Sequence, residues 1–215
     1  MTVIQFNGVS KTYRGQSVLA NVTLSIEAGR TYGVVGPNGA GKSVLLRLMC
    51  GLTLPSTGEV IIHPDYLDKH RTYPDRFGVA IDGPAYIPSL SAEAQLLELA
   101  RIRNRIGLAE VRDVLKEIGL NAPLRKKARA YSQGMKQKLS LAQAFMESPD
   151  VLLLDEPFNA LDRESMHRVK DLIHARHRAG ATIVFTSHHG ADIDELTDEV
   201  FEIDAGAVLM NRRRG

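Results

Sequence analysis

The chain has 215 residues and a net charge of +2, and 44% of its residues are hydrophobic. This hydrophobic share is enough to bury a sizeable core, while the small net charge excludes a field that would draw nucleic acid to the whole surface. The sequence has no apolar run of the ~18 residues that a membrane helix needs, and its start shows no signal peptide. We therefore expect any membrane role to depend on a partner.

Short apolar runs alternate with helical patterns along the chain. Val18–Ile26 alternates loosely, whereas Thr31–Val35, Val151–Leu154 and Thr182–Phe185 are continuous apolar runs typical of buried parallel strands. Helical spacing marks two segments, one with Val111, Val114, Leu115 and Ile118, the other with Met135, Leu139, Ala142 and Met146. This alternation predicts an α/β fold. We expect a single domain over residues 1–215, with a helical lobe at about 83–149 inserted between core strands.

Residues 36–43 read GPNGAGKS and fit the phosphate-loop pattern G-x-x-x-x-G-K-[ST]. The glycines let backbone N–H groups turn towards phosphates, and a helix that follows presents its N-terminus to the same anion. A glycine turn that fits the pattern by chance is disfavoured, because an apolar strand precedes it and the helical run Val44–Cys50 follows. Lys42 is expected to neutralise the β- and γ-phosphates and Ser43 to ligate Mg²⁺. The predicted nucleotide-binding residues are Gly36, Asn38, Gly39, Ala40, Gly41, Lys42, Ser43 and Val44.

Two acidic residues follow the apolar run Val151–Leu154. Ligands of open α/β sheets gather at the carboxyl ends of the strands, which is where Asp155 and Glu156 would lie. Asp155 is placed to hold Mg²⁺, and Glu156 to orient and deprotonate an attacking water. Taken alone, a strand that ends in an acidic turn is the simpler interpretation. Together with the phosphate loop, the pair predicts nucleotide hydrolysis.

Beyond these two motifs, further features follow in the order typical of one ATPase family. The sequence resembles the ABC ATPase family over essentially its whole length. The features that carry the resemblance are Tyr13 at the adenine-stacking position, the signature-like residues 131–137 (YSQGMKQ), the D-loop-like residues 159–162 (NALD), His188 at the switch position and a final hairpin pattern at 201–209. The resemblance implies a phosphate-loop ATPase core with a mostly parallel sheet, an antiparallel β portion at the N-terminus and the inserted helical lobe.

The signature carries the most distinctive implication. A helix N-terminus with the Ser132 hydroxyl and the Gly134 N–H can bind a γ-phosphate. In the family this phosphate belongs to ATP held by the opposite subunit, so the resemblance implies a head-to-tail dimer with a second copy or a related ATPase subunit, and ATP with Mg²⁺ as its ligands. Simpler interpretations stay open: Tyr13 as a packed tyrosine, His188 as a core histidine, and Asp162 as the N-cap of a helix over 163–178.

The resemblance implies an ATP-hydrolysing subunit of a transporter. It would act at the cytoplasmic face of the cell membrane, held there by separate membrane-spanning permease subunits. The alternative is a soluble ABC ATPase that acts on DNA, ribosomes or cluster assembly. Such proteins commonly carry two cassettes or long coiled-coil insertions, whereas this chain has one short cassette. A GTPase or a small kinase is disfavoured by the signature and by the acidic pair.

The sequence departs from the common family pattern at two places, the loop at 77–84 and the signature. Residues 77–84 read FGVAIDGP, which places Asp82 where most members have glutamine. A branch that resembles bacitracin and lantibiotic exporters carries an acidic residue there, usually Glu, and favours Ser-x-Gly-Met-Lys-Gln in its signature. Both departures predict an exporter of that branch. Asp82 is expected to reach Mg²⁺ through a water, the alternative being a side chain that points to solvent.

Overall fold

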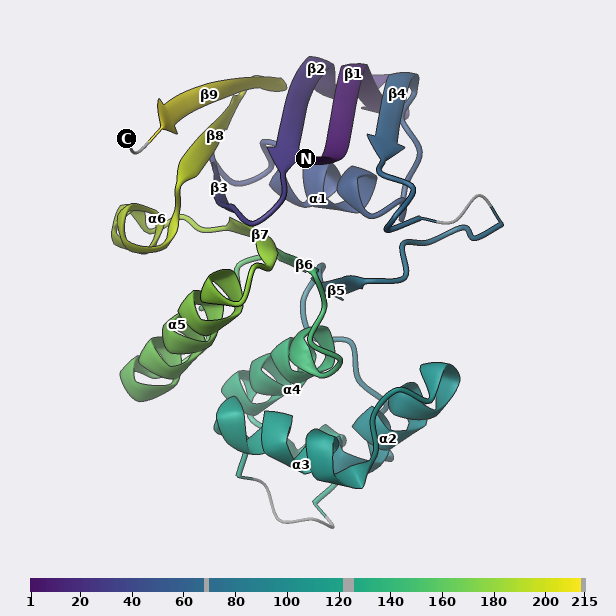
Figure 1. Ribbon diagram of the computed structural model, residues 1–215. Coiled ribbons are helices and arrows are strands. Elements are labelled where there is room, and N and C mark those ends of the chain that lie inside the picture. The colour runs from purple at the N-terminus through teal and green to yellow at the C-terminus, as the bar shows by residue number, and fades with distance from the viewer. Residues whose placement is uncertain (68–69, 122–125, 214–215) are drawn as a thin grey trace.

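The computed structural model describes residues 1–67, 70–121 and 126–213, which form two β-sheets and the helices around them (Figure 1). An antiparallel sheet of order β2-β1-β4 contains β1 (Thr2–Tyr13), β2 (Gln16–Glu27) and β4 (Thr57–Ile62). A second sheet, of order β5-β6-β7-β3-β8-β9, contains β5 (Phe77–Ala80), β6 (Val151–Leu154), β7 (Thr182–Thr186), β3 (Thr31–Val35), β8 (Glu199–Asp204) and β9 (Ala207–Arg213). Its pairings are parallel from β5 to β8, and β9 is antiparallel to β8. The predicted fold class is confirmed.

Two of the helices, at 108–117 and 133–145, lie where the apolar spacing predicts them. The described helices are α1 (Lys42–Met49), α2 (Ala92–Arg103), α3 (Leu108–Glu117), α4 (Gln133–Phe145), α5 (Arg163–Arg178) and α6 (Gly190–Leu196), with a 3₁₀ turn at Ala128–Ala130. No helix among the described residues combines the length and apolarity that crossing a membrane requires.

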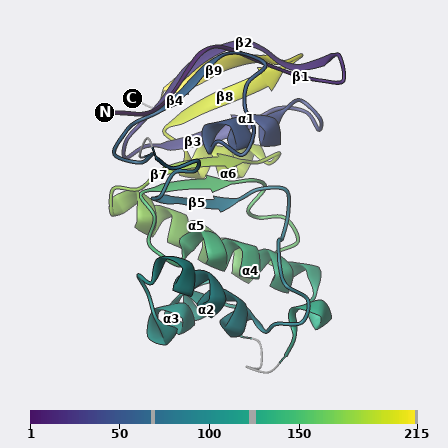
Figure 2. The same ribbon diagram turned by 90° about the vertical axis from the view of Figure 1, so that its right-hand side faces the viewer.

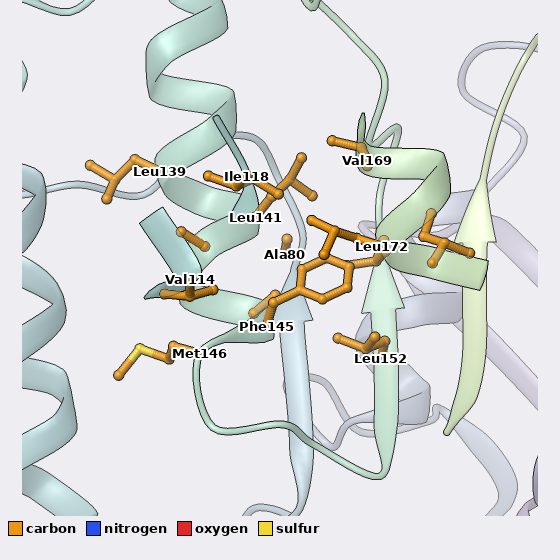
Figure 3. Packing of buried hydrophobic residues seen from close by; sticks show 14 of the residues in the cluster. Ala80, Val114, Ile118, Leu139, Leu141, Phe145, Met146, Leu152, Val169 and Leu172 are labelled. Carbon is orange, nitrogen blue, oxygen red and sulfur yellow. The ribbon is translucent and has the colours of Figure 1, made fainter. Parts of the chain in front are cut away.

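The parallel sheet is covered on both faces, which explains why its strands are apolar throughout. Val151 and Leu153 of β6 pack towards α1 and the antiparallel sheet, in a cluster that includes residues of β1, β2 and β3. Leu152 and Leu154 point to the opposite face, where they join residues of α3, α4, α5 and α6. Figure 3 shows part of this second cluster, in which Leu152 lies near Phe145 of α4. Figure 2 shows α1 between the antiparallel strands and the parallel sheet.

The segment 83–149 lies between β5 and β6 in the chain and contains α2, α3, the 3₁₀ turn and α4. In Figure 1, α2 and α3 lie at the end of the molecule away from the antiparallel sheet. Helix α4 packs directly on β5: a Cβ added to Gly78 would lie 2.0 Å from the Ala144 carbonyl oxygen. This close approach fixes α4 against the core, and its first turn reaches the acidic strand end described below.

Candidate active site

The phosphate loop joins β3 to α1 and is curled around a lysine ammonium group. Lys42 is buried, and its Nζ donates to the carbonyl oxygens of Gly36 at 2.8 Å and Pro37 at 3.2 Å. Gly41 has a φ of 104°, and a Cβ there would lie 3.0 Å from a methyl group of Val18. A glycine is therefore required at this position. The loop holds a positive charge beside the N-terminus of α1, which is the electrostatic arrangement that binds phosphate.

Asp155 follows β6 and has both carboxylate oxygens in hydrogen bonds. Ser43 Oγ donates to Oδ2 at 2.6 Å, and Thr186 Oγ1 donates to Oδ1 at 2.7 Å. The first contact joins the phosphate loop to the acidic strand end, and the second joins two neighbouring strands of the sheet. Hydroxyl and carboxylate oxygens are ligands that Mg²⁺ prefers, so Ser43 and Asp155 fit a divalent cation beside the phosphates.

Glu156 has a left-handed backbone conformation, and three side chains contact this residue. Its φ is 48°, in the left-handed region that costs a residue other than glycine about 1–3 kcal/mol. Its N–H donates to Thr186 Oγ1 at 2.7 Å, and its carbonyl accepts from Gln137 Nε2 at 3.2 Å. The carboxylate Oε2 lies 2.9 Å from His188 Nδ1. With the proton on Nδ1, His188 donates to this carboxylate and fixes its direction.

An ion cluster, in which Lys170 and Asp192 are buried, stabilises the segment that carries His188. Ser187 Oγ donates to Asp192 at 3.3 Å, and Lys170 Nζ lies 2.8 Å from Asp192 and 2.6 Å from Glu195. Burial opposes the charge on Lys170, but its hydrogen bonds to the two carboxylates outweigh burial and raise its pKa. The cluster thus joins α5 to α6 directly behind the switch position.

The predicted residues gather in part around one cleft. A hollow of about 280 Å³ lies at the mouth of the phosphate loop, and its lining is Val18, Asn38, Gly39, Gly41, Lys42, Ser43, Val44, Asp155 and Glu156. His188 reaches this cleft through its contact with Glu156. Six other predicted site residues do not line it: Tyr13, Gly36, Ala40, Asp82, Ser132 and Gly134.

Tyr13 and Asp82 contact residues at α1 and just after it. Tyr13 ends β1 with 40% of its surface exposed, and its hydroxyl lies 3.5 Å from Thr53 Oγ1. Asp82 has a φ of 67° and accepts from Arg47 Nε, with distances of 2.8 and 3.0 Å to its two oxygens. These hydrogen bonds raise the pKa of the Arg47 guanidinium. The predicted contact of Asp82 with Mg²⁺ would require the carboxylate to leave Arg47.

The signature residues begin α4 and lie close to the D-loop. Ser132 is the exposed N-cap, and its Oγ accepts from the Met135 N–H at 3.3 Å. A Cβ on Gly134 would lie 2.7 Å from the Ala160 carbonyl oxygen, so glycine is required where the two segments meet. Asp162 caps α5 by accepting from the Ser165 N–H at 2.8 Å, which lowers the pKa of Asp162. The capping interpretation of Asp162 is confirmed.

Three residues of this site were not among those predicted to act there. Thr186 holds both Asp155 and Glu156, Gln137 holds the backbone after β6, and Arg47 pairs with Asp82. One sequence signal could have identified Gln137, because it is the last of the signature-like residues 131–137. Arg47 and Thr186 lie 35 and 31 residues from their partners Asp82 and Asp155, and no local pattern joins them.

The mostly parallel sheet, the phosphate loop and the strand-end carboxylates define a phosphate-loop ATPase. The sequence pattern described as ABC transporter matches residues 19–159, and the chain belongs to this family of ATP-hydrolysing proteins. It is 36% identical to the uncharacterized ABC transporter ATP-binding protein YybJ of Bacillus subtilis (strain 168), over 98% of this chain and 97% of that protein.

Two further proteins show the same relationship. The chain is 32% identical to the bacitracin transport ATP-binding protein BcrA of Enterococcus faecalis, over 96% of this chain and 68% of that protein. Among solved structures, the dimeric ATP-binding cassette MJ0796 in a post-hydrolysis state bound to ADP and Pi has a TM-score of 0.88. It is 26% identical over 99% of each chain. The predicted likeness to the bacitracin branch is confirmed.

Proposed function

We propose that this ATPase drives export through separate membrane-spanning subunits, and that ATP binding closes it into a head-to-tail dimer. One observation carries the dimer: the cleft collects the phosphate loop and the acidic pair, whereas Ser132 and Gly134 of the same chain do not line it. Ser132 is exposed at the start of α4, where it is free to meet a second molecule. A partner's α4 would then complete the site.

In this proposal, the chain's own residues divide the work of hydrolysis. Lys42 and the loop N–H groups bind the β- and γ-phosphates, and the partner's signature closes over the γ-phosphate. Glu156 accepts a proton from the attacking water at its carboxylate, while His188 Nδ1 keeps that carboxylate in position. Tyr13 stacks on adenine after turning from Thr53. The Ser43 and Asp155 oxygens would hold Mg²⁺, which neutralises phosphate charge when bound.

Export and the membrane partners are supported by the relationship to a bacitracin transport protein and by two features of the chain. Asp82 and the signature-like residues 131–137 both follow the pattern of that branch. The permease subunits would hold the ATPase at the cytoplasmic face of the membrane. A soluble role in another process would leave the ATPase independent of any membrane protein.

The experiment is to produce the chain together with its candidate permease and to prepare inside-out vesicles. With bacitracin as the probe, ATP should drive uptake into vesicles that carry the parent chain, and the permease should stimulate ATP hydrolysis. Vesicles with Glu156→Gln are the matched control and should take up none. A permease that neither binds the ATPase nor changes its turnover would contradict the transport role.

A further inference from the structure

Gln137 is a buried polar residue that contacts the left-handed backbone turn at Glu156. Only 8% of its surface is exposed, and its Nε2 lies 3.2 Å from two carbonyl oxygens, those of Glu156 and Pro157. A side-chain amide that donates to two successive carbonyls fixes the direction of the backbone between them. Here that backbone carries the carboxylate proposed to act as the base.

The conformation at Glu156 needs support from outside its own strand. Its φ of 48° places a residue with a Cβ in the left-handed region, which persists only where neighbours determine it. Thr186 accepts from the Glu156 N–H, and Gln137 donates to the Glu156 carbonyl. The two peptide groups that flank this residue are therefore held from opposite sides, one by β7 and the other by α4.

The same helix begins with the signature. Ser132 caps α4, and Gln137 lies five residues further along, one and a half turns from the cap. Between them, Gly134 meets the Ala160 carbonyl without room for a side chain. Helix α4 thus contacts residues 156–160 at two points, and a shift of its first turns would move the backbone of Glu156.

We propose that Gln137 is a positioning residue for hydrolysis, which fixes the backbone turn at Glu156 of its own subunit. Helix α4 would then serve two sites, since Ser132 contacts the partner's nucleotide and Gln137 orients the base beside the chain's own nucleotide. The second statement rests on the head-to-tail dimer proposed above, whereas the first depends only on contacts within one chain.

The first test separates positioning from folding. Gln137→Met keeps the side-chain volume but removes the donor, and should lower turnover by about 10–100-fold, because small misplacements of reacting groups have effects of that order. ATP affinity should not change. Gln95→Met is the matched control: Gln95 is equally buried, and its side chain accepts from the Ile87 N–H in another part of the molecule. It should lose thermal stability and keep its turnover.

A second variant gives a readout that lost stability alone would not produce. Gln137→Glu places a carboxyl group against two carbonyl oxygens, which repel it when it is ionised and accept its O–H when it is protonated. Turnover of this variant, divided by that of the parent at the same pH, should rise as the pH falls. A ratio that stays constant with pH, together with normal turnover in Gln137→Met, would overturn the proposal.

Mixed dimers decide which site Gln137 serves. Gln137→Met mixed with Ser132→Arg should recover one active site, because the second subunit has an intact base and receives an intact signature. Mixed with Glu156→Gln, it should recover none. Recovery with Glu156→Gln, or with neither partner, would overturn action within one subunit. Ser132→Arg mixed with Glu156→Gln is the control, and no recovery in this mixture would mean that the head-to-tail dimer is wrong. In that case the positioning role is still decided by Gln137→Met alone, which should lose turnover and keep its ATP affinity.

Discussion

Replacing Thr186 by valine tests how the two acidic residues are held. The side chain is fully buried, and its hydroxyl donates to Asp155 Oδ1 and accepts from the Glu156 N–H, each at 2.7 Å. Valine has nearly the same shape but makes neither hydrogen bond. A hydrogen bond to a charged group contributes about 1.5–3 kcal/mol, and a neutral one about 0.5–1.5 kcal/mol. We therefore expect Thr186→Val to lower the free energy of unfolding by about 2–4 kcal/mol.

In a chain of this size, that loss corresponds to a fall in Tm of roughly 4–16 °C. Turnover should fall by about 100-fold, since the Asp155 carboxylate and the Glu156 backbone each lose a positioning contact, while ATP affinity changes little because Lys42 is untouched. Thr186→Ser is the control: it keeps the hydroxyl and should retain most activity. The measurements are calorimetry and ATPase kinetics on all three proteins. Parent-like stability and turnover in Thr186→Val would refute the reasoning.

Three further changes have separate expected outcomes. Lys42→Ala removes the cation that faces the phosphates and should abolish most ATP binding and hydrolysis, at a cost of about 2.7–4 kcal/mol in transition-state terms. Near-normal ATP affinity by titration calorimetry together with near-normal turnover would contradict this. Lys170→Met leaves Asp192 buried and unpaired and should cost about 3–5 kcal/mol. Folding raises the pKa of Lys170, so its contribution to the free energy of unfolding should be constant below the usual lysine pKa of about 10.4 and should shrink only above it. Urea unfolding at neutral pH that shows no difference in stability between the variant and the parent would contradict this prediction. A double-mutant cycle on Arg47→Ala and Asp82→Ala should give a coupling of about 0.2–1 kcal/mol that salt weakens, and strictly additive effects would contradict this coupling.

Much of the core could be predicted from sequence because its strands are buried on both faces. The bounds predicted for β3 and β6 match the structure, and β7 is longer by Thr186. β4 and β5 were not predicted as strands. β4 is partly exposed and lies at the edge of its sheet, and Gly78 interrupts the apolar residues of β5, so neither has a strong hydrophobic period.

The site was predictable where its residues are neighbours in sequence or share a family motif. The phosphate loop and the acidic pair meet at one sheet edge because the parallel strands that carry them end there. Contacts between distant side chains were not predictable. The contact of Asp82 with Mg²⁺ stays a prediction, whereas the hydrogen bonds from the Arg47 guanidinium to its carboxylate had not been predicted. Arg47 lies 35 residues from Asp82 in the chain, and no local sequence pattern identifies it as the partner.

The central claim is that ATP closes two copies head to tail, with each signature on the other's nucleotide. The most direct measurement is the molar mass of Glu156→Gln by light scattering, with ATP and Mg²⁺ present. The variant should be a dimer with ATP and a monomer without it. Adding Ser132→Arg to this variant should keep ATP bound but leave the protein monomeric. If both proteins form the same dimer, or if Glu156→Gln stays monomeric with ATP bound, the claim is contradicted.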